Sequence, residues 1–163
     1  MRYLGLVILT ATLATACGAN TSAPVSPSAI RTPSVLSAAG TWSGTSTDTT
    51  GSAQLSWTVT QNGTDMTGTM SVGNTGRSMM GTGTMRGTVN GQALTFHMDV
   101  PSGGFSGMMS ACSMGVDGQG TMSADGHTLT GTYSGSLVGM MTAGMMNQSC
   151  GGAMNNGQFT MTR

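Results

Sequence analysis

One short turn motif occurs three times in this chain, each time between stretches in which apolar and polar residues alternate. The motif is Asn-Gly or Asp-Gly, then two further residues, an apolar residue and a threonine. It occurs at residues 62–67, 90–95 and 125–130. Asn-Gly and Asp-Gly readily adopt the positive φ angles that tight β-hairpins require. We therefore predict three hairpins, joined to one another by longer loops.

The stretches around these turns have the period of a β-strand. Leu55–Val59, Met66–Val72 and Leu94–Val100 each alternate between apolar and polar residues, which predicts strands with one buried face. The 27 glycines and the many threonines disfavour helix. Extending the pattern predicts eight strands, near residues 40–46, 53–61, 64–73, 82–89, 92–100, 112–122, 127–135 and 157–163. The longer loops are then 47–52, 74–81, 101–111 and 136–156.

Strands that follow one another as antiparallel neighbours have alternate connections at opposite ends. All three tight turns should therefore share one end, and all the long loops the other. Eight antiparallel strands can close into a barrel and leave no exposed edge. Inward-facing glycines such as Gly68, Gly87 and Gly131 would ease the bending that closure needs. We predict an all-β fold, an eight-stranded antiparallel up-and-down barrel, with a two-sheet β-sandwich as the alternative.

The N-terminal residues have the pattern of an export signal. Arg2 precedes an apolar run, Leu4–Leu13, and small residues come before Cys17. Such a run is too short to span a bilayer and is typical of a secretory signal peptide. We assign residues 1–16 to the signal and residues 17–38, which are rich in Ser, Thr and Pro, to an extended tether. Residues 39–163, about 125 in number, have the size of one domain.

The end of this signal, Leu13-Ala14-Thr15-Ala16-Cys17, resembles the lipobox of bacterial lipoproteins. It departs from the family pattern at Ala14, where the family prefers leucine, and an ordinary secretory cleavage is the alternative. The resemblance implies that Cys17 is acylated and that its acyl chains attach the protein to a membrane. Gly18 stands where the best-known sorting systems have an aspartate for inner-membrane retention. The expected location is therefore the outer membrane of a Gram-negative cell envelope.

The number of cysteines agrees with acylation of Cys17. The chain has three cysteines, so an exported protein with one disulfide has one cysteine left over. If Cys17 carries lipid, Cys112 and Cys150 remain to pair in an oxidising compartment.

The two ends of the domain carry a second resemblance. Gly40-Thr41-Trp42 opens the first predicted strand, and Arg163 ends the last. This arrangement resembles the lipocalin and avidin (calycin) superfamily of small ligand-binding barrels. The resemblance implies that Arg163 packs against the face of Trp42 at the tight-turn end, as a cation–π contact. It extends to no ligand-site motif: the ring of tryptophans that avidins use is missing, and so is the C-terminal helix of lipocalins.

Methionine is unusually frequent, with 17 in the chain. Seven have the parity of the apolar strand face and are expected in the core: Met66, Met70, Met85, Met98, Met114, Met122 and Met161. Most of the others, together with Met154, fall in or beside the predicted long loops and so gather at one end. The candidate ligand-binding residues there are Met79, Met80, Met108, Met109, Met140, Met141, Met145 and Met146, with Arg77.

Three interpretations of this methionine-rich end remain open. In the first, the side chains form a second small core with no ligand, as in a purely structural envelope protein. In the second, they line an adaptable apolar pocket, because thioethers suit varied apolar ligands and an eight-stranded barrel can hold one small ligand. In the third, they bind Cu(I) or Ag(I), with Met140, Met141, Met145 and Met146 as soft ligands.

Other functional classes lack support in the sequence. Charged residues make up 6% of the chain and the formal net charge is zero, which argues against nucleic-acid binding. No nucleophile motif or carboxylate pair appears, and His97 and Asp99 have the parity of the outer face. We expect a non-enzymatic protein without a cofactor, whose partners are a membrane and possibly one small apolar molecule. The oligomeric state stays open.

Overall fold

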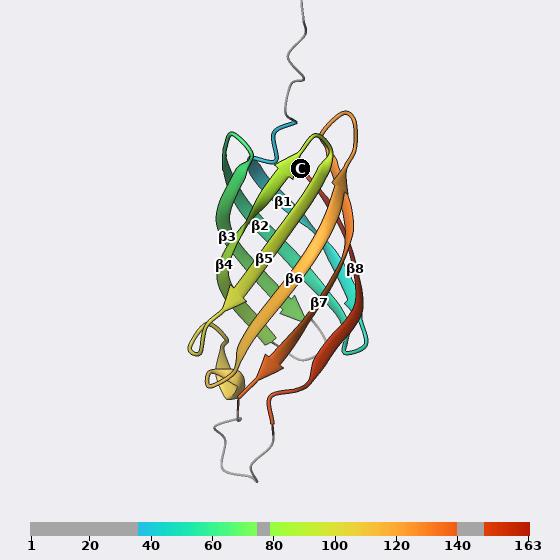
Figure 1. The fold of residues 1–163 in the computed structure, drawn as a ribbon. Helices are drawn as coiled ribbons and strands as arrows, with labels where there is room; N and C mark the ends of the chain where they lie inside the picture. The colour runs from blue at the N-terminus through green and yellow to red at the C-terminus, as the bar shows by residue number, and fades with distance from the viewer. Residues whose placement is uncertain (1–35, 75–78, 140–148) are drawn as a thin grey trace, which may run out of the picture. The chain divides into compact units, whose positions relative to one another are not determined.

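The computed structural model describes residues 36–74, 79–139 and 149–163. Eight antiparallel strands follow one another in chain order and close into a barrel in which β8 pairs with β1 (Figure 1). Their bounds are β1 Gly40–Asp48, β2 Gly51–Asn62, β3 Asp65–Asn74, β4 Met79–Asn90, β5 Ala93–Val100, β6 Ser113–Met122, β7 Thr128–Val138 and β8 Ala153–Thr162. This confirms the up-and-down barrel and excludes the two-sheet sandwich.

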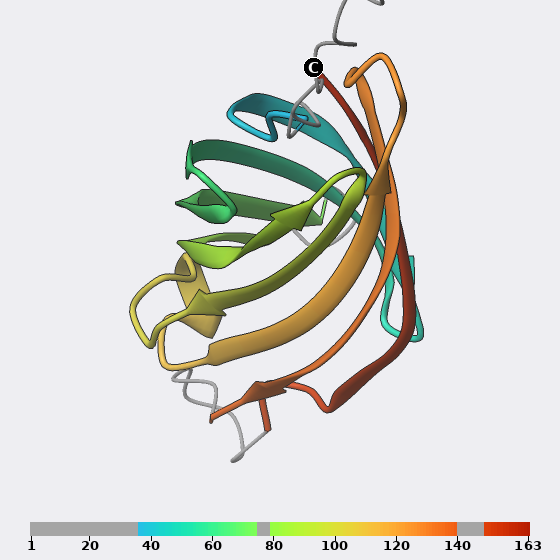
Figure 2. The same ribbon diagram turned by 45° about the horizontal axis from the view of Figure 1, so that its top comes forward.

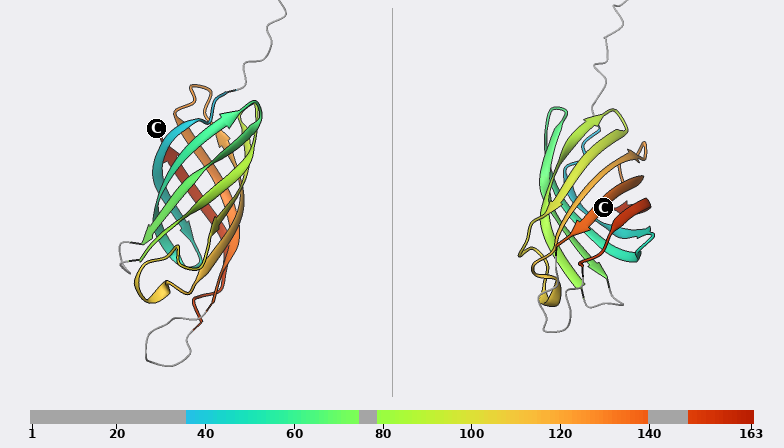
Figure 3. Two further views of the ribbon diagram at one scale, coloured as in Figure 1. Left: turned by 90° about the vertical axis from the view of Figure 1, so that its left-hand side faces the viewer. Right: turned by 60° about the horizontal axis from the view of Figure 1, so that its bottom comes forward.

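The barrel has two different ends. The β2–β3, β4–β5 and β6–β7 turns lie at one end, together with the start of β1 and the end of β8; we call this the closed end. The other four connections lie at what we call the open end, which carries a short 3₁₀ helix, η1 (Gly107–Met109). Figure 1 has the closed end at the top, Figure 2 turns it toward the viewer, and the right-hand view of Figure 3 brings the open end forward.

The glycines of the repeated motif adopt the conformation that the turns need. Gly63 and Gly91 have φ angles of 62° and 60°, each at the first central position of a two-residue turn. Positive φ at this position alone is the mark of a type II′ turn. The third motif makes a longer turn over residues 123–127, in which Gly126 has a φ of 74°. These three connections confirm the hairpins predicted from the sequence.

The connection between β1 and β2 was wrongly predicted as a loop over residues 47–52. It is a turn of two residues, Thr49 and Thr50. The Asp48 carboxylate accepts hydrogen bonds from the backbone N–H and the hydroxyl of Thr50, both at 2.6 Å. Hydrogen bonds to an aspartate side chain can stabilise a tight turn without an Asn-Gly or Asp-Gly pair. The prediction relied on such pairs and therefore missed this turn.

The starts of β4 and β8 were also placed too late. β4 begins at Met79 and not at residue 82, so Met79 and Met80 belong to a strand. β8 begins at Ala153 and not at residue 157, because the sequence Asn155-Asn156-Gly157 forms a bulge inside the ladder. Asn156 has a φ of 54° there, a conformation that asparagine tolerates better than most residues.

Inward-facing side chains form one hydrophobic core inside the barrel. All seven methionines expected in the core are buried, with exposed fractions between 0% and 7%. Near the middle of the barrel, the rings of Trp57, Phe96 and Phe159 contact one another, with centroid distances of 5.0 to 5.5 Å. Aromatic pairs at such distances stabilise a core beyond the area they bury.

The closed end is held by Trp42 and Arg163. The guanidinium carbon of Arg163 lies 4.7 Å from the centroid of the Trp42 ring, and its Nη1 donates a hydrogen bond of 2.6 Å to the carbonyl of Ala39. The Trp42 indole N–H donates to the carbonyl of Ala38 at 2.8 Å. Strand number, strand order and this closed end are consistent with a calycin-like barrel.

Candidate functional site

A cavity of about 130 Å³ lies in the open half of the barrel. Trp57 and Phe159, from the aromatic contacts at mid-barrel, form its floor. The side walls are mainly aliphatic and thioether side chains from five strands: Leu55, Met70, Val72, Met98, Met114, Val116 and Leu137. Buried side chains, among them Trp42, Met66 and Met122, occupy the closed half of the barrel.

Small side chains on β1 and β2 create this space. Ser46 and Ala53 are cross-strand partners in the register of the two strands, and both line the cavity. A barrel of eight strands is just wide enough for its interior to be filled, so a pair of small residues on its wall leaves a void.

The connection between β5 and β6 covers part of the opening. Phe105 is 3% exposed and lines the cavity. Its segment is held against β4 by hydrogen bonds from Thr82 N–H to the Gly104 carbonyl and from Ser106 N–H to the Met80 carbonyl, both 2.9 Å. The ring lies over Gly81, where a Cβ atom would collide with it. Phe105 was not recognised in the sequence because its loop has no periodic pattern.

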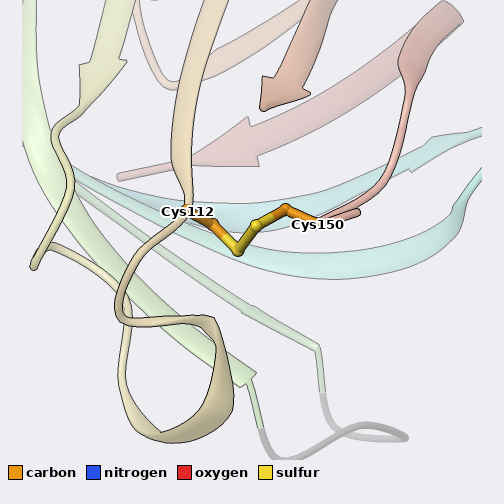
Figure 4. The surroundings of a disulfide bond; sticks show 2 residues. All are labelled: Cys112 and Cys150. Atoms are coloured by element: carbon orange, nitrogen blue, oxygen red, sulfur yellow. A yellow bond between two sulfur atoms is a disulfide. The ribbon is translucent and has the colours of Figure 1, made fainter. Parts of the chain in front are cut away.

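A disulfide joins the two sides of the open end. Cys112, just before β6, is bonded to Cys150, just before β8 (Figure 4). Their Cα atoms are 5.8 Å apart and both residues are buried. The pairing predicted from cysteine number is confirmed. Cys150 also lines the cavity, so the disulfide positions part of the cavity wall as well as closing a long loop.

Three polar side chains form a connected group on the wall where β1 and β7 approach the opening. The Tyr133 hydroxyl donates a hydrogen bond of 2.6 Å to Asp48 Oδ2, and the Ser46 side chain is close enough to Tyr133 to act on its pKa, which it lowers. Partial burial acts to raise the pKa of Asp48, but the hydrogen bonds from Thr50, Tyr133 and backbone N–H groups outweigh it and lower the pKa below 3.8. Asp48 is therefore ionised at neutral pH.

Tyr133 is neutral at physiological pH. Burial, together with the hydrogen bond to the Asp48 carboxylate and its negative charge, raises the pKa of Tyr133 to about 12. No sequence pattern connects Tyr133 with Asp48. The two residues are 85 positions apart, and only barrel closure brings them together.

One polar atom at this site has no partner. The indole Nε1 of Trp57 is buried and is the only buried side-chain nitrogen or oxygen in the described residues without a hydrogen-bond partner. Trp57 is 1% exposed. A buried N–H group without an acceptor costs about 1–3 kcal/mol.

The methionines predicted to bind a ligand separate into different positions. Met109 lines the cavity and Met154, beside the predicted loop, lines it too. Met80 is 61% exposed at the start of β4 and does not line it. Met79 lies in β4 and Met108 in η1. Met140, Met141, Met145, Met146 and Arg77 lie outside the described residues, as does Cys17.

The remaining polar groups of the described chain form no second centre. His97 lies across from Asp117 on the outer face, with Nδ1 2.7 Å from Oδ1; the sequence had grouped it with Asp99 instead. In residues 36–74, 79–139 and 149–163, no three His, Cys, Asp or Glu side chains gather as a metal site would need. The same residues contain no helix with the length and apolarity of a membrane span.

Comparisons of this chain with protein families, with curated proteins and with solved structures gave no match.

Proposed function

We propose that this protein is an exported lipoprotein whose barrel binds one small, mainly apolar molecule in the cavity at its open end. The observation that carries the proposal is a cavity in the open half of the barrel, bordered by side chains from seven of the eight strands. Aliphatic, thioether and aromatic side chains supply most of its wall.

The volume sets the size of the molecule. An apolar cavity of about 150 Å³ engineered into another protein stays dry and binds benzene. A cavity of 130 Å³ therefore suits a single ring or a short branched chain. Met70, Met98 and Met114 line it and are flexible side chains that can adapt to different shapes, so a somewhat larger molecule with one end at the opening would also fit.

Toluene titration of the full-length protein tests the pocket. Bound toluene should raise the melting temperature, because a ligand that binds only the folded state stabilises it. Val72 lines the cavity and is partly exposed, so Val72→Phe should direct a ring into the cavity and weaken toluene binding at least about tenfold. Val138→Phe is the matched control, since Val138 is 54% exposed and does not line the cavity.

Two outcomes would overturn the pocket. A wild-type protein that shows no response to toluene, or equal responses of Val72→Phe and Val138→Phe, would leave the purely structural role as the better explanation. The Cu(I) alternative gains nothing from the cavity, because its four methionines at positions 140, 141, 145 and 146 lie outside the described residues.

The lipoprotein part of the proposal is supported by the cysteines. With Cys112 and Cys150 in a disulfide, Cys17 is the remaining one of three. The chain also enters β1 at the closed end, opposite the cavity, so attachment through residues that precede β1 leaves the opening accessible.

Metabolic labelling with radioactive palmitate tests the anchor. The wild-type protein expressed in a Gram-negative host should incorporate the label and enter the detergent phase in Triton X-114 partitioning. Cys17→Ser should do neither, while Cys112→Ser with Cys150→Ser should still be labelled. Cleavage of the wild type without labelling would favour ordinary secretion.

A further inference from the structure

The chain contains two tryptophans whose indole groups differ in one respect. Both are 1% exposed. The Trp42 indole N–H has an acceptor, the carbonyl of Ala38 at 2.8 Å. The Trp57 indole N–H has none among the described residues, although Trp57 lies at the floor of the cavity. A buried donor of this kind is stabilised by any acceptor that reaches it.

The negative charge of Asp48 on the cavity wall indicates which kind of hydrogen-bond acceptor a ligand could present to the Trp57 N–H. Among the described residues that line the cavity, Asp48 is the only one ionised at neutral pH, and none is an Arg, Lys or His. Tyr133, the other titratable group among them, is neutral. A carboxylate brought into this space would lose its hydration and meet a like charge with no compensating cation from these residues, which is strongly unfavourable.

We propose that the molecule bound in the cavity is a neutral compound with an oxygen acceptor, such as a ketone, ester or lactone, and that the Trp57 indole N–H donates to this oxygen. This inference rests on the proposed function and assigns the chemical class of its ligand. The apolar part of the molecule contacts the methionine and aliphatic walls, and the oxygen points toward the floor.

The cross-strand neighbour of Trp57 is a flexible side chain on the cavity wall. Met70 is the Cα partner of Trp57 in the β2–β3 register and also lines the cavity. Its side chain has three rotatable bonds and changes conformation at low cost. Since Trp57 is 1% exposed, the proposal requires that the ligand displace a side chain such as this one to reach Nε1.

Three probes of nearly the same shape test the inference: acetophenone, α-methylstyrene and benzoate. Acetophenone has a carbonyl oxygen where α-methylstyrene has a methylene group, and the two are otherwise identical. Benzoate has a negatively charged carboxylate at the same place. In the ¹H–¹⁵N spectrum of the full-length protein, the two indole N–H signals report on Trp42 and Trp57 separately. Acetophenone should move the Trp57 proton downfield beyond the shift that α-methylstyrene causes, while Trp42, already bonded to Ala38, serves as the internal reference.

Affinities provide the second measurement. Replacing Trp57 by phenylalanine keeps an aromatic floor and removes the donor. Trp57→Phe should weaken acetophenone binding roughly three- to tenfold more than it weakens α-methylstyrene binding, the factor that one ordinary hydrogen bond supplies. Benzoate should bind the wild type more weakly than acetophenone at pH 7. If Trp57→Phe fails to fold, the indole spectrum of the wild type still decides.

Failure of the inference and failure of the proposed function look different. If none of the three probes binds, the pocket itself is wrong. If acetophenone and α-methylstyrene bind and shift the Trp57 signal equally, the cavity binds ligands but Nε1 is not the donor, and the inference is overturned. Tighter binding of benzoate than of acetophenone would overturn the assignment to neutral compounds.

Discussion

At the scale of single side chains, the cavity is distinguished by one hydrogen-bonded pair and one unpaired donor. Asp48 and Tyr133 hold the β1 and β7 sides of the wall together through a 2.6 Å hydrogen bond. Trp57 at the floor has no acceptor for its indole N–H. The Asp48–Tyr133 pair satisfies its own hydrogen bond, whereas the Trp57 N–H is the donor that we propose for the ligand.

The Asp48–Tyr133 pair predicts how stability depends on alkaline pH. The folded-state pKa of Tyr133 is raised from 10.0 to about 12, so its contribution to stability is complete below pH 10 and is lost as pH rises from about 10 to about 12. In a Tyr3→Phe background, where Tyr133 is the only tyrosine of the chain, the tyrosinate absorbance should appear near pH 12. Asp48→Asn should bring it closer to pH 10.

Urea unfolding across the same pH range checks the linkage. The free energy of unfolding of the Tyr3→Phe protein should fall between about pH 10 and pH 12, and the additional change Tyr133→Phe should reduce that fall. Ionisation of Tyr133 near pH 10, unaffected by Asp48→Asn, would show that the pair does not exist in solution.

At the scale of structural elements, the sequence predicted those turns whose conformation depends on the turn residues themselves. Asn62-Gly63 and Asn90-Gly91 set their turns through backbone conformation alone, so both hairpins were placed correctly. The β1–β2 turn depends on hydrogen bonds from Thr50 to the Asp48 side chain, and the β8 bulge depends on pairing with β7. Neither has a strong local signal, and Asn156-Gly157 even mimics a turn, which is why these two elements were misplaced.

The disulfide at the open end should contribute substantially to stability. Cys112 and Cys150 are 38 residues apart, and cross-linking a loop of this length removes conformational entropy from the unfolded chain worth about 3–4 kcal/mol. The double variant Cys112→Ser, Cys150→Ser should lower the free energy of unfolding by about that amount in urea titrations. Wild-type protein treated with a reducing agent is the control and should behave similarly. A loss below about 1 kcal/mol would show that the loop is restrained without the bond.

At the scale of the whole molecule, strand number, order and closure followed from period-two patterns and turn spacing, but the cavity did not. The void depends on Ser46 and Ala53 facing each other in the closed barrel, and its cover depends on Phe105 folding back against β4. The first relation depends on the register of a hairpin whose turn was not recognised, and the second involves a loop without periodicity. Of the candidate methionines in the described residues, Met109 lines the cavity; most of the rest of its wall comes from residues that the sequence assigned to the core or did not single out.

Diffraction from crystals of the protein pressurised with xenon tests the central claim most directly, because xenon enters empty apolar cavities without needing polar contacts. The account predicts one strong xenon peak in the open half, bordered by Trp57, Met98 and Val116, and none in the closed half. Continuous side-chain density through the open half with no xenon peak would contradict the cavity on which the proposed function depends.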